Sequence, residues 1–518
     1  LFGILTINTD SAKVILTGSG VNAYNISGTG NKAFTDLEIN KQGGSMSLST
    51  NASTTRNLTL SGGALLLSTK TMYVGGNFTV NGGTLTQQTG TIALNGSGAQ
   101  SVSSTLLYNL TIEKSGGTAT FAGNTTSTNN FLLSGGTLSL GTNAYNVGGN
   151  FTVSGGTFTP GTGAVNLNGS GAQSVSSTSL YDLSIAKSGG TVTFAGNVTS
   201  TNNFSLTGGT ISLGTKAFDV GGNFTVNGGV FTPGTATTTL NGAGAQSVSS
   251  TSFAALTIDK SGGTVTFAGN TTSTGGFKLF GGTLSLGTSA FFVGGDFIVS
   301  GGVFTPGTAT TTLNGVSGQS VSSTGFYDVV IDKSSGTATF SHVSSTIGNI
   351  MLLNNGTLNL GNGTTTFTGA GTPLQLPGGS FNPANGTVSY RDNQTVASTT
   401  YYNLVIDPVS AKTATLNAST TAIGFVTINA NGTLALGANN FTVLGTVRNT
   451  GLITVTTGNF IHTAESVLFS DSSGSEVASY TNTASIYVTV QDSDQNMDGA
   501  AVETFAIPVN FNAAAGSD

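Results

Sequence analysis

The residues best suited to binding a ligand stand near the end of the chain, in a short acidic segment. Side chains with oxygen atoms occupy alternating positions there, and one more carboxylate follows: Asp492, Asp494, Asn496, Asp498 and Glu503. Several hard oxygens converging from one turn, with a carboxylate at the twelfth position, suit Ca²⁺. We therefore name these residues as a candidate Ca²⁺ site, of the weak kind that extracellular calcium would fill.

Two features separate this segment from an EF-hand. Gly499 follows Asp498, whereas an EF-hand loop has its glycine at the sixth place. The flanking runs SIYVTV and ETFAIPV are typical of strands and not of helices. No Lys or Arg follows Arg448, so the segment is uniformly acidic. A calcium loop between strands and a solvated acidic hairpin turn remain alternative interpretations.

No comparable group of residues indicates catalysis. Glycoside cleavage needs two carboxylates across a bond, and the few acidic residues of the body do not recur: Asp182 and Asp328 align with Asn109 and Ala255. The two histidines are isolated, at His342 and His462. We therefore expect that the chain is not an enzyme. The alternative is a carbohydrate-binding or polysaccharide-cleaving β-helix whose site is assembled from distant coils.

A 73-residue tandem repeat organises most of the chain. Five lysines recur at this interval and define the first five copies: Lys41, Lys114, Lys187, Lys260 and Lys333. Four glutamines keep the same spacing within AQSVSS or GQSVSS: Gln100, Gln173, Gln246 and Gln319. In a sixth, degenerate copy, Pro408 stands at the lysine position.

Each copy alternates strand-like runs with turns. Runs such as NFTV, TTTL and TVTF are separated by GG, NGG, PG and SGG. About nine runs per copy predict about three coils, averaging about 24 residues each. We expect an all-β fold in which residues 1–460 form a β-solenoid (β-helix) of five repeats plus the degenerate sixth. A small β-sandwich-like module over residues 461–518 would follow.

The composition argues against several other classes. The chain of 518 residues has only 14 basic and 20 acidic side chains and no Cys. It lacks the clustered Lys and Arg that nucleic-acid binding requires. No run approaches the roughly 18 apolar residues of a membrane span, so we do not expect the chain to span a membrane. The strand-like opening LFGILTINTD indicates a processed product or a piece of a longer polypeptide.

Several phrases resemble the β-strand repeats of very large prokaryotic surface proteins, including giant adhesins and surface-fibre or S-layer-like proteins. They are GGNFTVNGG, GSGAQSVSS, GGTVTFAGN and SGGTLSLG. The acidic phrase IYVTVQDSDQNMDGAAVET resembles Ig-like modules that accompany them. The resemblance covers nearly the whole chain and brings no catalytic residue. It implies that residues 461–518 are an acidic Ig-like module, which we expect to be incomplete or completed by a neighbour.

The resemblance also implies an extracellular, cell-surface structural role, as a filament, sheath, surface layer or adhesin stalk. The first coil starts in the middle of a repeat, which would leave its edge strands open. We therefore expect copies of the chain to stack head to tail into a homo-oligomer or filament. Surface glycans are the other expected partner class, and nucleic acids are not expected.

Overall fold

The computed structural model describes residues 13–19, 24–322, 325–341 and 344–462, and the backbone of three later strands. The described residues form strands β1 to β60 joined by turns, and none of them lies in a helix. Between β1 (Lys13–Gly18) and β57 (Phe460–His462), neighbouring strands run parallel and wind into a β-solenoid of about 22 turns. The prediction of an all-β solenoid is therefore confirmed.

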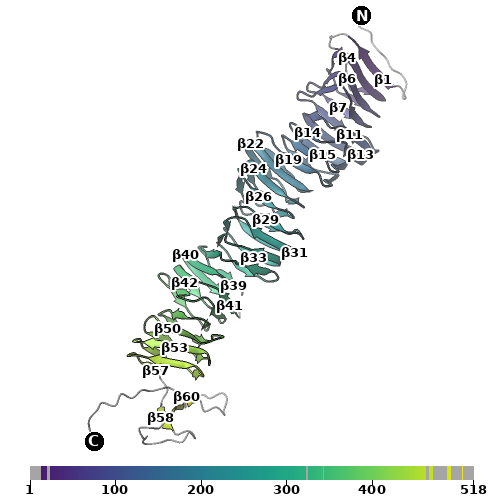
Figure 1. The fold of residues 1–518 in the computed structure, drawn as a ribbon. Helices are drawn as coiled ribbons and strands as arrows, with labels where there is room; N and C mark the ends of the chain where they lie inside the picture. The colour runs from purple at the N-terminus through teal and green to yellow at the C-terminus, as the bar shows by residue number, and fades with distance from the viewer. Residues whose placement is uncertain are drawn as a thin grey trace, which may run out of the picture. The chain divides into compact units, whose positions relative to one another are not determined.

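The chain falls into two compact units. The first comprises Leu1–Thr272 and Phe280–Thr283, and the second comprises Ser273–Leu279 and Leu284–Asp518. Figure 1 shows strands of successive turns lying side by side within each unit. The same turn geometry recurs in both units, so the first unit serves to describe it.

One turn of the solenoid has three faces, each carrying a short strand segment. The 13-residue strand β13 (Asn109–Phe121) bends across two faces, and β14 (Thr125–Ser127) covers the third. On the next turn, β15 (Phe131–Ser139) and β16 (Tyr145–Val147) lie against them. The paired residues are 19 to 21 positions apart, so this turn is shorter than the coil that the sequence predicted.

The bend inside β13 explains why the sequence suggested too few strands. Gly117 has a φ of 68°, in the left-handed region that favours glycine, and it turns the strand around a corner without an interrupting loop. Gly136 does the same in β15, with a φ of 70°. From β13 to β21 (Thr178–Leu180) there are nine strands, but β13 and β15 each cover two faces. A copy therefore supplies eleven face segments.

Eleven segments on three faces make three and two-thirds turns, which corrects the expected three coils per copy. The column that starts at Leu110 of β13 continues through Phe131 and Phe151 to Val175. The equivalent long strand of the next copy, β22 (Asp182–Phe194), instead joins the column of β16 and β19 (Ala164–Leu167). Equivalent residues of successive copies therefore lie on different faces.

Stacking fills the interior with apolar columns and the corners with amide ladders. The rings of Phe131 and Phe151 lie on consecutive turns with centroids 4.8 Å apart, and both are fully buried. At a corner, Asn130 Oδ1 accepts the N–H of Asn150 at 2.9 Å, and Asn150 Oδ1 accepts the N–H of Ser174 at 2.8 Å. These bonds satisfy backbone donors where the strand ladder is interrupted.

Two buried hydroxyls interrupt the apolar columns. Thr238 and Thr311 are fully buried, and their Oγ1 atoms have no hydrogen-bond partner among the described residues. Thr238 pairs with Phe218, at the place where Val165 of the preceding copy pairs with Tyr145. Valine therefore fits this position, and the hydroxyl is desolvated without compensation.

We predict that Thr238→Val stabilises the first unit by about 1 kcal/mol, because it removes an unsatisfied buried hydroxyl. Urea unfolding followed by circular dichroism measures the change. Val165→Thr is the matched reverse variant and should destabilise by a similar amount. A loss of stability in Thr238→Val would show that its hydroxyl has a partner.

Candidate functional site

The lysines that mark the repeat are buried inside the solenoid. All five are at most 4 % exposed, although lysine is among the residues most rarely buried. In β13 the inward positions alternate from Leu110 through Ile112 to Lys114, so the strand period directs the lysine to the interior. Burial lowers the pKa of Lys114, and of its equivalents in the third, fourth and fifth copies.

Carbonyl oxygens surround the buried ammonium in place of a carboxylate. Lys114 Nζ donates to Gly96 O at 2.6 Å, to Gly98 O at 2.8 Å and to Gln100 Oε1. Gln100 Nε2 in turn donates to Val74 O at 2.8 Å and to Gly76 O at 2.5 Å. We call this arrangement of lysine, glutamine and glycine carbonyls the Lys–Gln clamp. It ties together three successive turns.

The Lys–Gln clamp recurs in each of the next three copies. Lys187 donates to Gly169 O and Gln173 Oε1, and Lys260 donates to Gly242 O and Gln246 Oε1. In the second unit, Lys333 Nζ lies 2.6 Å from both Gly315 O and Gln319 Oε1. The glutamine precedes its lysine by the same interval in all four copies. Sequence analysis used both residues only to measure the repeat, although this constant spacing was visible.

Glycine allows the loop of the clamp to come close enough to the lysine. Gly96 packs directly over Gly75 of the preceding turn, and a Cβ atom on Gly96 would collide with the Gly75 carbonyl oxygen. The same contact joins Gly169 to Gly148 in the next copy. A side chain at either loop glycine would push away the carbonyl that accepts the lysine proton.

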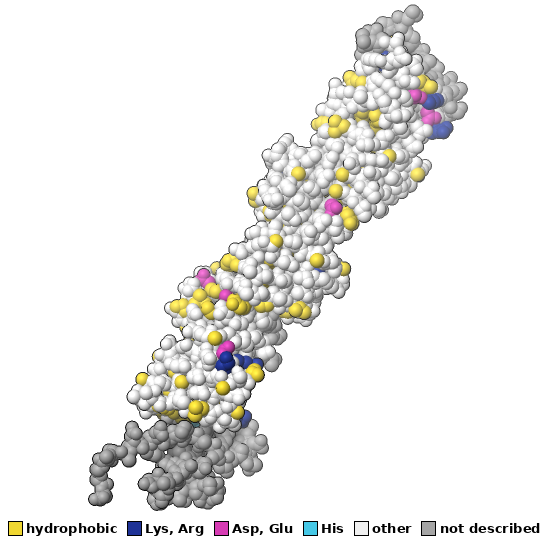
Figure 2. Space-filling view, viewed as in Figure 1, with side chains coloured by type: hydrophobic (Ala, Val, Ile, Leu, Met, Phe, Trp, Pro, Cys, Tyr) yellow, Lys and Arg dark blue, Asp and Glu magenta, His cyan; other side chains and the backbone are white. Residues whose placement is uncertain are grey.

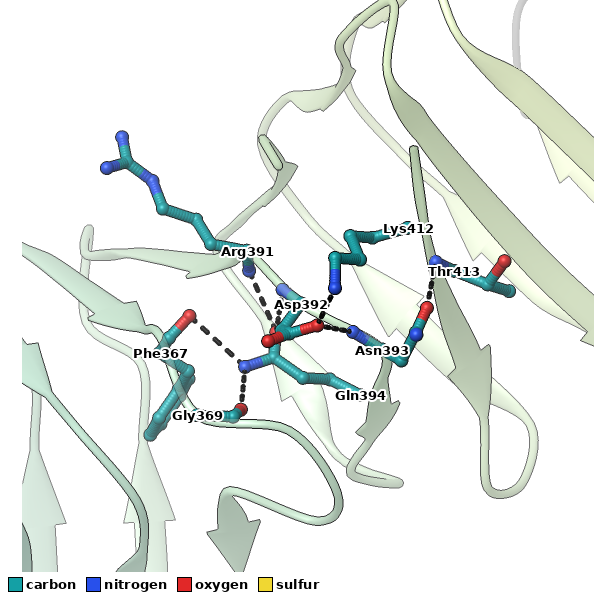
Figure 3. Close-up of polar contacts among 8 residues, drawn as sticks. All are labelled: Phe367, Gly369, Arg391, Asp392, Asn393, Gln394, Lys412 and Thr413. Carbon is teal, nitrogen blue, oxygen red and sulfur yellow. Dashed lines mark hydrogen bonds and ion pairs between the residues drawn. The ribbon is translucent and has the colours of Figure 1, made fainter. Parts of the chain in front are cut away.

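The sixth copy shows how the solenoid closes when the lysine is absent (Figure 3). Pro408 replaces the lysine, and the loop before Gln394 is shorter, with three residues where the fifth copy has five. Gln394 Nε2 still donates to Phe367 O, at 3.2 Å. Its Oε1 now accepts the backbone N–H groups of Arg391 at 2.8 Å and Asp392 at 3.2 Å. The lysine and the loop residues that held it have therefore disappeared together.

Charged groups in the sixth copy have moved to the surface. Lys412 forms a 2.8 Å ion pair with Asp392, and this bond lowers the pKa of the Asp392 carboxyl. Arg391 forms a 2.7 Å pair with Asp407. Charged side chains are otherwise sparse on the face shown in Figure 2. Exposed ion pairs of this kind contribute about 0–1 kcal/mol each.

The predicted calcium ligands lie outside the residues whose side chains the structure describes, and so does His342. No described residues form a group of three or more His, Cys, Asp or Glu side chains that could hold a metal ion. His462 Nε2 lies 2.6 Å from Gly445 O. Asp182 accepts hydrogen bonds from Asn202 and Asn203 at a corner of the solenoid. The calcium site stays a prediction.

The part of the chain that the structure describes contains no helix long and apolar enough to cross a membrane. Its fold and repeated clamps define a class: a parallel β-solenoid built from tandem repeats. Comparison with protein-family models, curated proteins and solved structures gave no match to the chain. What it does must therefore be inferred from its own residues.

We predict that Lys187→Met destabilises the first unit by about 2–4 kcal/mol, because it leaves Gln173 Oε1 and Gly169 O buried without a donor. Chemical unfolding measures the loss. Shortening the loop at residues 168–172 to Arg-Asp-Asn, as in the sixth copy, should recover at least half of it. Lys278→Met, at an exposed lysine, is the control. A neutral effect of Lys187→Met would rule out the clamp as a stabilising element.

We predict a pH dependence of the same pair of proteins. The folded-state pKa of Lys187 is below its ordinary value of 10.5, so the unfolded chain binds this proton more tightly. The stability of the wild type relative to Lys187→Met should therefore rise as pH increases from the lowered pKa towards 10.5. Unfolding free energies measured from neutral to alkaline pH test this. A decrease over that range would mean that the carbonyls favour the proton.

Proposed function

We propose that the chain is an extracellular structural protein, forming part of a cell-surface fibre, sheath, surface layer or adhesin stalk. The observation that carries the proposal is the Lys–Gln clamp, repeated through four copies and linking three turns each time. Such a device adds no chemistry of its own. It holds one turn of the solenoid against the next, as a protein under mechanical tension requires.

The direction of the hydrogen bonds supports this proposal. In a parallel solenoid, the bonds between turns run along the solenoid axis, so pulling two turns apart must break the ladders of three faces together. The clamp adds bonds from Gln100 and Lys114 that cross the same gaps. Outward amide ladders such as Asn130 to Asn150 reinforce the corners. Resistance to separation is therefore spread along each unit.

The resemblance to prokaryotic surface repeats supports the extracellular location, and a 73-residue building unit suits growth by duplication. In this proposal, copies of the chain stack into filaments. The acidic segment Asp492–Glu503 is the proposed Ca²⁺ site, and calcium would stiffen the joint there.

Negative-stain microscopy of the full chain, with and without millimolar calcium, tests the proposal. We expect end-to-end filaments at high protein concentration, and we expect calcium to lengthen them. A quadruple Lys→Met variant at the four clamps should form fewer or shorter filaments. Monodisperse particles under all conditions would contradict assembly. Strong glycan-array binding without assembly would instead favour the carbohydrate-binding alternative.

A further inference from the structure

One corner of the sixth copy has lost the polar character that it has elsewhere. In the second copy this corner follows β14 and carries Thr128 and Asn130, whose N–H groups donate to Leu107 O and Asn109 Oδ1. In the sixth copy, the corresponding bonds to Tyr401 O and Asn403 Oδ1 come from Ile423 and Phe425. The backbone bonding is the same in the two copies, whereas the side chains have become apolar.

The next turn of the sixth copy extends the apolar corner. Leu444 donates its N–H to Ala422 O and so lies beside Ile423, where the fifth copy has Thr368 bonded to Ile347 O. The three side chains are well exposed, at 44 % for Ile423, 37 % for Phe425 and 51 % for Leu444. Clustered exposed apolar groups of this kind mark a surface that another element covers.

The chain itself runs past this corner. β57 pairs with β54 (Phe441–Val443), and its last residue, His462, lies opposite Val443. His462 Nε2 also contacts Gly445 O at 2.6 Å. Residues 463–518 therefore continue the chain from a point immediately next to Leu444.

That C-terminal segment includes a small antiparallel sheet. Its strands are β58 (Ser466–Ser470), β59 (Tyr487–Gln491) and β60 (Thr504–Phe505). The register and the two-residue period of strands place five apolar residues on one face: Val467, Phe469, Val488, Val490 and Phe505. Three short strands need a surface on which to bury such a face.

We propose that this sheet docks, within the same chain, on the corner formed by Ile423, Phe425 and Leu444. Each of the two surfaces is apolar by composition, and the connection between them starts at the corner itself. Charge favours the same pairing, since residues 391–462 carry a net charge of +1 and residues 463–518 carry −8. The sixth copy would then complete the C-terminal module, with no need for a neighbouring chain.

Restoring the polar corner tests the docking. The variant Ile423→Thr, Phe425→Asn, Leu444→Thr uses the residues of the second and fifth copies, so the solenoid backbone accepts them. Hydrogen exchange of the full chain should become at least tenfold faster in 466–470 and 487–491. Val230→Thr, at another exposed apolar position, is the control and should leave this exchange unchanged. Unchanged exchange in the triple variant would overturn the proposal.

Disulfide trapping separates docking within one chain from docking between chains, because the natural sequence has no cysteine. Leu444→Cys is combined in turn with Phe469→Cys, Val488→Cys or Phe505→Cys, and with Thr489→Cys as the control for the opposite face of the sheet. At least one of the first three pairs should oxidise within the monomer, and the control pair should not. Oxidation only between chains, or in none of these pairs, would overturn the proposal.

Discussion

A lysine ammonium buried among carbonyl oxygens determines much of the surrounding geometry. Charge taken out of water is costly unless its donors are satisfied. At Lys114 the acceptors are two glycine carbonyls and a glutamine side chain. The loop must therefore be long enough to present both carbonyls and free of side chains where it touches the turn below. The glutamine must also reach two further carbonyls, so a single buried charge constrains three turns.

The copies at the two ends of the series show two other ways of meeting this constraint. In the sixth copy the charge is gone, and backbone N–H groups of a shorter loop satisfy the remaining glutamine. In the first copy the charge remains, but Ser27 stands at the glutamine position. There Lys41 Nζ lies 3.9 Å from the centre of the Tyr24 ring, a cation–π contact. Lysine, glutamine and loop length thus change as a set.

The sequence was sufficient to predict the solenoid, because strand-like runs and turn residues alternate without a break. It was not sufficient to count the strands, because Gly117 and Gly136 bend continuous strands around corners and look like ordinary turn residues. The lysines were misjudged for a different reason. A charged side chain is normally exposed, and only the glutamine at a fixed distance before each lysine hints at a buried partner. The predicted calcium ligands depend on a local turn, Asp492–Glu503, whose conformation the repeat pattern does not constrain.

The fractional number of turns per copy has a consequence for how such a chain can change length. Adding or removing one copy would keep every strand paired, yet it would rotate all that follows by two-thirds of a turn. Only a change of three copies, or eleven whole turns, restores the original facing. Variation in copy number would therefore alter the direction in which a terminal module points as well as its distance. Length and orientation are inherited together in this architecture.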